Sequence, residues 1–281
     1  MFYKKIAVSA LALAISGTAF AADFKVGDDY ILTGAVASTA QKVQVTEYFG
    51  YWCPHCNNFE PLLEQWLEEK ADSIEFSRVP VAFSTRSQNQ VLAQKAYYVG
   101  KQVKLQKSVD STMFDFYHKY GRLASSFKDI DKIQADPAAC TAEVNGLVDR
   151  AQKQSAQSNK PFDVASVTAY LNENVCNTDA RGWALLKLSK ESRGSISNEE
   201  TLQGVMAIAG VDTEKFSKRL ESFSMTSAMA AGNKKAEILG IDSVPTLVIN
   251  DKYRVTSAKG FQHMLDVVEF LIEKEEAEVK K

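Results

Sequence analysis

The chain shows two kinds of apolar spacing, one typical of buried strands and one typical of helices. Residues 42 to 51 and 74 to 83 are rich in β-branched and aromatic side chains, which favours strands. The first run is apolar on both sides, as expected for a central strand that is covered on both faces. Between the two runs, residues 57 to 70 carry apolar side chains at helical spacing. The pattern therefore predicts a strand, a helix and a second strand, in this order.

A long helical block separates these elements from a second pair of strands. Residues 87 to 239 show helical spacing almost throughout, with Ser, Asn and Asp at positions that suit helix starts. Residues 246 to 249 and 253 to 255 then predict a two-stranded hairpin, and residues 261 to 271 predict a final amphipathic helix. The charged tail, residues 273 to 281, is expected to be a solvated helix end. This order indicates an α/β domain that is interrupted by a helical domain at about residues 84 to 240.

Two cysteines lie where the first strand meets the first helix, in the sequence Cys53-Pro54-His55-Cys56. Such a CxxC pair is typical of a thioredoxin-like redox centre, so we expect a thioredoxin-like fold with a large helical insertion. At a helix N-terminus, unpaired backbone N–H groups and the helix dipole favour a thiolate over a thiol. Cys53 is therefore the predicted reactive sulfur and Cys56 its resolving partner. His55 can add a hydrogen bond or a positive charge, or it is only an exposed spacer.

A CxxC pair can also belong to a zinc site or to a structural disulfide. Zinc would need two further Cys or His ligands at a compatible spacing, and the remaining cysteines and histidines of this chain occur singly. A structural bridge rarely closes so short a loop at the start of a helix. We therefore expect a redox pair that works without a metal and without a bound cofactor.

The first 21 residues have the pattern of a secretory signal peptide. Lys4 and Lys5 precede an apolar core at residues 6 to 15, and Ala19-Phe20-Ala21 provides a cleavage site, so the mature chain is predicted to be residues 22 to 281. Export leads to an oxidising compartment, and a bacterial periplasm fits this signal best. The mature chain has 31 basic and 35 acidic residues, because the signal removes two lysines and no acid. Its formal charge of −4 argues against a nucleic-acid partner.

Glu47 is an acidic residue in the middle of the first predicted strand, six positions before Cys53. A carboxylate in an apolar strand is costly unless it is paired or protonated. Its position suggests that it accepts and donates the proton of Cys56 during thiol–disulfide exchange. The alternative is that this part of the strand is simply exposed.

Several motifs together resemble the DsbA family of periplasmic dithiol oxidases. They are Glu47-Tyr48-Phe49, Cys53-Pro54-His55-Cys56, Phe59-Glu60, Val244-Pro245 and Asn250-Asp251-Lys252-Tyr253. The resemblance implies a cis peptide bond before Pro245, packed against the reactive sulfur, with Val244, Pro245 and Thr246 binding a peptide in strand fashion. It also implies that Glu60 and Arg78 flank the buried acid, for which the alternative is a solvated ion pair between the two side chains.

The resemblance further implies a function, for which two alternatives stay open. A DsbA-like protein introduces disulfides into exported proteins that carry free thiols, and a DsbB-like quinone reductase in the membrane reoxidises it. The alternatives are a disulfide isomerase or reductase, and a non-catalytic chaperone module that binds peptides beside Pro245. Valine rather than threonine before Pro245 favours the oxidase.

The family pattern does not cover an extra segment at about residues 124 to 195. This segment holds Cys140 and Cys176, and no other unpaired thiol is available to either in an exported chain. We therefore predict that they form a second, structural disulfide. Free buried thiols and an intermolecular bridge are the alternatives.

Overall fold

The computed structural model describes residues 24–38, 40–70 and 72–279, so the predicted signal peptide lies outside the described residues. Within these ranges, no helix is both long enough and apolar enough to cross a membrane. In chain order the elements are β1 (Ile31–Leu32), β2 (Val43–Phe49), α1 (Pro54–Lys70), β3 (Ile74–Pro80), α2 (Gln88–Val103), α3 (Gln106–Phe114), the π-helix η1 (Asp115–Tyr120), α4 (Gly121–Ser126), α5 (Ile130–Ala135), α6 (Pro137–Gln157), α7 (Val164–Leu171), the π-helix η2 (Asn172–Cys176), α8 (Ala180–Ser192), α9 (Glu199–Ile208), α10 (Phe216–Leu220), α11 (Phe223–Ile238), β4 (Thr246–Ile249), β5 (Tyr253–Thr256), the 3-10 helix η3 (Ser257–Lys259) and α12 (Phe261–Val279).

A five-stranded mixed sheet in the order β1-β5-β4-β2-β3 forms the centre of the thioredoxin-like part. Strand β2 is central, as predicted: it pairs in parallel with β3 and antiparallel with β4. Glu47 in β2 lies opposite Arg78 on one side and Leu247 on the other. The predicted α/β thioredoxin-like fold with a helical insertion is confirmed.

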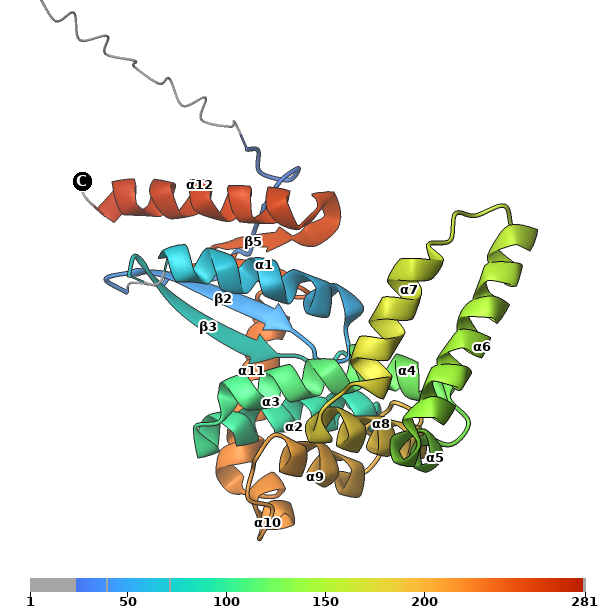
Figure 1. Cartoon of the computed structure of the whole chain (residues 1–281). Helices are drawn as coiled ribbons and strands as arrows, with labels where there is room; N and C mark the ends of the chain where they lie inside the picture. The colour runs from blue at the N-terminus through green and yellow to red at the C-terminus, as the bar shows by residue number, and fades with distance from the viewer. Residues whose placement is uncertain (1–23, 39, 71, 280–281) are drawn as a thin grey trace, which may run out of the picture.

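Helices cover both faces of this sheet (Figure 1). Helices α1 and α12 share one apolar core with the sheet, in which Phe59 and Leu63 of α1 and Val268 of α12 are buried. On the other face, Leu239, just after α11, packs with Tyr48 of β2. Burial on both faces explains why β2 is apolar on both sides.

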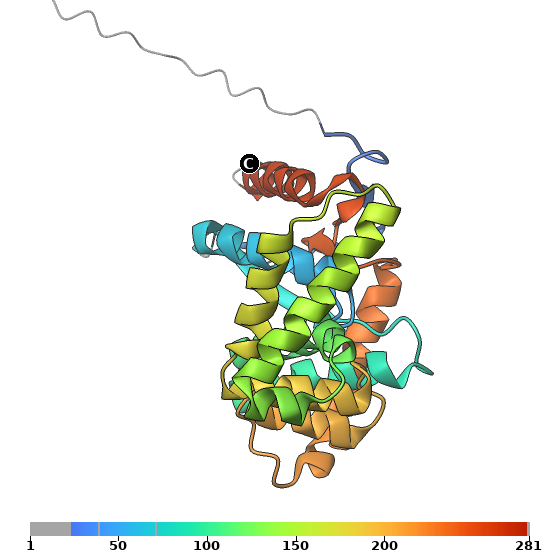
Figure 2. The same cartoon turned by 45° about the vertical axis from the view of Figure 1, so that its right-hand side comes forward.

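Helices α2 to α11 form the insertion between β3 and β4, and their core also includes Phe49 of β2 and both cysteines of the CxxC pair. Helices α6 and α7 lie side by side in both views (Figures 1 and 2), and in Figure 1 they project from the other helices as an arm. Helix α7 has no buried residue. The predicted disulfide between Cys140 and Cys176 is present in the structure and joins the start of α6 to the end of η2, at the base of the arm.

Two element ends differ from those predicted. The first helix begins at Pro54 rather than at residue 57, because proline needs no N–H partner in the first helical turn and has a suitable φ. The last helix continues to Val279, and its final part is not simply a solvated end. There Glu275 is buried and accepts hydrogen bonds from Asn250 Nδ2 (2.8 Å) and Tyr253 OH (2.9 Å) and a charged one from Lys252 Nζ (2.8 Å).

These contacts predict that Glu275→Gln lowers stability at neutral pH by about 1–3 kcal/mol, because a buried charged acceptor is lost. Burial alone would raise the pKa of Glu275, but the hydrogen bonds from Lys252, Asn250 and Tyr253 lower it. A lowered pKa stabilises the fold above the usual glutamate pKa, and this stabilisation is lost as the pH falls through the folded-state value. Urea denaturation at pH 7 and pH 3 should show a large difference from the wild type only at pH 7. The exposed Glu273→Gln is the matched control and should change neither value.

Candidate active site

The N-terminus of α1 positions the two cysteines of the CxxC pair. Cys53 directly precedes the helix, and its N–H donates to the carbonyl oxygen of Gly50 (2.9 Å), which closes a turn after β2. Cys56 lies one turn further along and is fully buried, whereas Cys53 keeps 5% of its surface exposed. Pro54 and His55 are exposed between them. Neither cysteine is bonded to another residue, so the structure represents the dithiol form.

The surroundings of the two thiols shift their pKa values in opposite directions. Hydrogen bonds from the Cys56 thiol and from the backbone N–H groups of Cys56 and His55, together with the charge of His55, lower the pKa of Cys53 to about 6 even though burial opposes the shift. Burial raises the pKa of Cys56 far above its usual value, and the Cys53 sulfur and the Glu47 carboxyl add to this effect. At neutral pH, Cys53 is therefore the thiolate and Cys56 the thiol.

The loop before β4 brings a cis peptide bond to the reactive sulfur. The Val244–Pro245 bond is cis, and the Cys53 sulfur lies 3.4 Å from the carbonyl oxygen of Val244, across 191 positions of sequence. Val244 and Pro245 thus lie where the sequence placed them. The side chain of Thr246 is fully buried, and its hydroxyl donates to the carbonyl oxygen of Ser243 (2.8 Å). Because its hydroxyl is used within the loop, this side chain supports the loop, and the strand-fashion binding expected of residues 244 to 246 stays a prediction about their backbone.

Glu47 is buried in the middle of β2, with 1% of its surface exposed. The alternative of an exposed strand is therefore wrong. Burial raises the pKa of Glu47 to about 7; Arg78 lowers it, and the neighbouring carboxylates of Glu60 and Asp110 raise it. Its only ion-pair partner among the described residues is Arg78, whose Nε lies 2.7 Å from Oε2. A carboxyl group that titrates near neutrality can both hold and release a proton at physiological pH.

Glu60 and Arg78 form a tight pair rather than a solvated one. The guanidinium Nη1 and Nη2 donate to the two carboxylate oxygens of Glu60 at 2.9 and 2.7 Å. Both side chains are largely buried, at 11% and 16% exposure. Arg78 therefore links α1 to the strand that carries it, directly beside Glu47.

Two further residues contact the active-site turn from the helical insertion, and the sequence did not reveal them. Asp110 of α3 accepts a hydrogen bond from the hydroxyl of Tyr51, and His118 of η1 places its Nε2 2.7 Å from the carbonyl oxygen of Tyr51. Because a carbonyl only accepts, this nitrogen is the donor. Tyr51 lies two positions before Cys53, so the insertion holds the turn at two points. The contacts span 59 and 67 positions, and no local pattern signals them.

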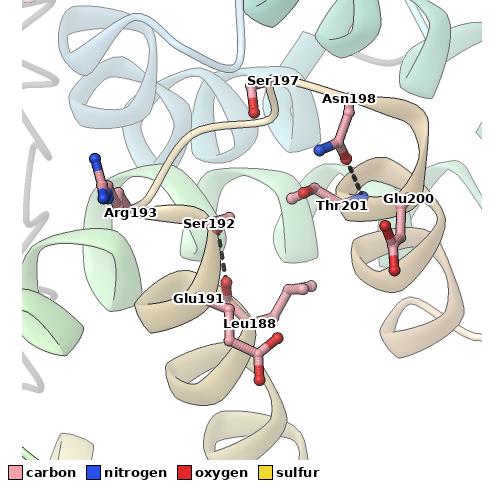
Figure 3. Close-up of a pocket in the computed structure, with 8 residues that line it drawn as sticks. All are labelled: Leu188, Glu191, Ser192, Arg193, Ser197, Asn198, Glu200 and Thr201. Atoms are coloured by element: carbon pink, nitrogen blue, oxygen red, sulfur yellow. Dashed lines mark hydrogen bonds between the residues drawn. The ribbon is translucent and has the colours of Figure 1, made fainter.

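A cleft of about 600 Å³ opens between α1 and α3, next to Glu60 and Asp110. Its lining residues are Asn57, Glu60, Pro61, Glu64, Gln106, Lys107, Asp110, Ser111, Phe114 and Asp115. A separate pocket of about 510 Å³ lies between the end of α8 and the start of α9 (Figure 3), where Asn198 caps α9 by accepting from the N–H of Thr201. That pocket contains none of the predicted site residues.

Comparisons with known proteins agree with this geometry. The family model described as thioredoxin matches residues 33–267. The thiol:disulfide interchange protein DsbA of Pseudomonas aeruginosa is 24% identical over 279 residues, covering 98% of this chain and 97% of that protein. The protein of the same name from Azotobacter vinelandii is 25% identical over 258 residues, covering 90% and 86%. The crystal structure of Pseudomonas aeruginosa DsbA superposes with a TM-score of 0.59 and 23% identity, covering 92% of this chain and 98% of that one.

Proposed function

Since the chain belongs to the thioredoxin family and is a thiol:disulfide oxidoreductase, we propose that it works as an oxidase, introducing disulfides into exported proteins through Cys53 and Cys56. The observation that carries this proposal is the unequal acidity of the two thiols. The pKa of Cys53 is lowered to about 6, which stabilises the reduced enzyme and makes Cys53 a good leaving group. An enzyme whose reduced form is favoured oxidises its partners.

The exchange proceeds in two steps from the oxidised enzyme. A substrate thiolate attacks the sulfur of Cys53; a new bond to the substrate forms, the bond between Cys53 and Cys56 breaks, and Cys56 leaves as a thiolate. Protonated Glu47 supplies a proton to Cys56, whose raised pKa favours the thiol. A second substrate thiolate then attacks the substrate sulfur, which forms the substrate disulfide and releases Cys53 as a thiolate. The substrate loses two electrons and the enzyme gains them.

The loop at Val244 and Pro245 is the proposed peptide-binding element. The Val244 carbonyl lies beside the Cys53 sulfur, so a peptide bound in strand fashion along this loop would have its cysteine close to the reactive atom. His55 is exposed between the cysteines, where it can favour the Cys53 thiolate. In this proposal, the two parts of the thioredoxin-like domain, before and after the helical domain, carry the reacting residues. The helical domain at about residues 84 to 240 shapes the surface beside these residues.

The setting in which the enzyme works is part of the same proposal. The signal-like first 21 residues support export, and a periplasmic enzyme meets folding proteins that have free thiols. Each substrate disulfide leaves the enzyme reduced, so an oxidant must restore the disulfide, and the proposed oxidant is a DsbB-like quinone reductase in the membrane.

The stability of the two redox forms tests the proposal. The lowered pKa of Cys53 stabilises the reduced fold fully above the usual thiol pKa, and this gain declines as the pH falls below that value until it is lost at about pH 6. We expect the reduced protein to melt at a higher temperature than the oxidised protein at pH 8, with the difference shrinking towards pH 5. The reduction potential, measured against glutathione, should be more oxidising than that of a reductase. A reducing potential, or a more stable oxidised form, would identify an isomerase or reductase, and a protein without exchange activity would be the chaperone module.

Glu47→Gln should separate proton transfer from folding. The raised pKa of Glu47 means that the wild type loses stability as the pH rises from about 4.5 to about 7, where the buried carboxyl ionises. Glutamine cannot ionise, so the variant should be more stable than the wild type at pH 8, by about 1–3 kcal/mol. Formation of the mixed disulfide at pH 7 should slow by roughly tenfold to a hundredfold. Unchanged exchange rates from pH 5 to 8 would show that Glu47 has only a structural role.

A further inference from the structure

Three carboxylates surround one guanidinium where the sheet meets the helical insertion. Arg78 lies 2.7 Å from Glu47, pairs with both oxygens of Glu60, and has Nη1 3.5 Å from Asp110 Oδ2. All four side chains are largely buried, with 1% to 16% of their surface exposed. If every carboxyl were ionised, the cluster would carry a net charge of −2 away from bulk water. Repulsion of this kind favours retention of one proton within the cluster.

Glu47 is the member best suited to hold that proton. Glu60 accepts two charge-assisted hydrogen bonds from Arg78, and Asp110 accepts hydrogen bonds from Tyr51 and from Gln106 Nε2 (2.6 Å), which stabilises both as anions. Both also line the cleft between α1 and α3, whereas Glu47 does not. Burial raises the pKa of all three carboxyl groups, but Glu47 is the most deeply buried, with 1% of its side chain exposed against 16% for Glu60 and 13% for Asp110.

We propose that Asp110 is a positioning residue for thiol–disulfide exchange, which acts through Arg78 to keep a proton on the Glu47 carboxyl for delivery to Cys56. This inference rests on the role given to Glu47 in the proposed function. Asp110 belongs to the helical insertion, so the insertion takes part in the chemistry as well as in the shape of the surface. Asp110 does not touch the sulfurs of Cys53 and Cys56. Its effect on Glu47 passes through Arg78, the cation that both carboxylates share.

The charge of Asp110 changes the proton affinity of Glu47 in two ways. It draws on the same guanidinium, so that less of the Arg78 charge stabilises ionised Glu47, and it repels ionised Glu47 directly. The groups that face these two carboxyls are Arg78 of β3, Glu60, Glu64 and Cys56 of α1, Tyr51 and Cys53 of the turn, Tyr97 of α2, and Gln106 and Lys107 of α3. Among these, Arg78 is the cation that both carboxyls contact.

A neutral residue at position 110 should therefore lower the proton affinity of Glu47. In Asp110→Asn, Arg78 has two carboxylate partners in place of three, and the net charge of the fully ionised cluster falls to −1. The pKa of Glu47 should fall from about 7 by about one unit, a tenfold loss of proton affinity. At pH 7 most Glu47 would then be ionised and unable to protonate Cys56.

The titration of Glu47 can be followed directly by ¹³C NMR of glutamate-labelled protein in the dithiol form, with the resonance assigned by its absence in Glu47→Gln. The midpoint should fall in Asp110→Asn and in the second neutral variant, Asp110→Ser. It should stay near the wild-type value in Asp110→Glu, which restores the charge. Asp115→Asn is the matched control, because Asp115 lines the same cleft but pairs with Arg181 (2.7 Å) and not with Arg78. An unchanged midpoint in the neutral variants that fold overturns the inference.

The pH profile of mixed-disulfide formation gives a second readout, with each rate divided by that of Glu47→Gln at the same pH. This ratio should decline above about pH 7 in the wild type, and about one unit lower in Asp110→Asn. If Glu47→Gln slows exchange but Asp110→Asn shifts neither the midpoint nor the profile, this inference fails and the role of Glu47 stands. If Glu47→Gln exchanges at the wild-type rate, the role of Glu47 fails, and the inference about catalysis fails with it.

Discussion

Replacing Cys53 with serine should reduce dithiol oxidation to the uncatalysed rate, whereas replacing Cys56 with serine should trap mixed disulfides. The Cys53 sulfur is slightly exposed beside the Val244 carbonyl and ionises near pH 6, so it can attack a disulfide and be attacked. Cys56 is fully buried and holds its proton strongly. Without Cys56, a substrate bound to Cys53 cannot be released from within the enzyme.

Non-reducing electrophoresis after incubation with a disulfide-containing client should show a trapped complex only for Cys56→Ser. Alkylation gives the matching pH dependence: in the reduced wild type, the rate at Cys53 should rise with a midpoint near pH 6. Equal trapping by both variants, or an alkylation midpoint near the usual thiol value, would contradict the assigned order of the two cysteines. In the reduced wild type, Cys56 serves as the internal control, since it should resist alkylation throughout this range.

Replacing both Cys140 and Cys176 with alanine should lower the free energy of unfolding by about 3 to 4 kcal/mol and leave the oxidation rate nearly unchanged. The bridge closes a loop of 36 positions, and the chain-entropy model gives a stabilisation of this size. Helix α7 has no fully buried residue, and only partly buried side chains such as Val167 and Leu171 pack it against the core, so the bridge is a main constraint on this part of the arm. The active-site residues lie on other elements, so their chemistry should be preserved.

Urea denaturation of both proteins measures this loss, and limited proteolysis should show earlier cleavage in the arm. A control double variant, Thr141→Ala with Asn177→Ala, changes the neighbouring positions and keeps the bridge. It should remain within about 1 kcal/mol of the wild type, as is usual for surface substitutions. Equal stability of the cysteine-free protein and the wild type would mean that the arm is held by other contacts.

The parts of the site that depend on local order could be predicted from the sequence. Cys53 and Cys56 are recognisable because a strand, a CxxC pair and a helix follow one another directly. Glu47 stands out because an acid in a doubly apolar strand has few explanations. The α/β order of elements likewise follows from the spacing of apolar residues, which differs between helices and strands and is visible along the sequence.

The remaining parts depend on contacts between distant segments, which spacing does not encode. Asp110 sits on a helix whose apolar pattern says nothing about Tyr51 or Arg78. Glu275 lies in a run of charges that predicts exposure, yet its partners at Asn250, Lys252 and Tyr253 make burial favourable.

The strand order has a consequence for folding of the chain during its synthesis. Strand β2 pairs with two neighbours. One of them, β3, follows soon after β2 in the sequence, but the other, β4, begins only at Thr246. A chain that emerges N-terminus first therefore presents both cysteines of the CxxC pair long before the Val244–Pro245 loop exists. The helices between have mostly neighbouring partners and can assemble during this interval. The reactive centre is thus completed only when the last two strands enter the sheet, so a nascent chain carries its thiols without yet being an enzyme.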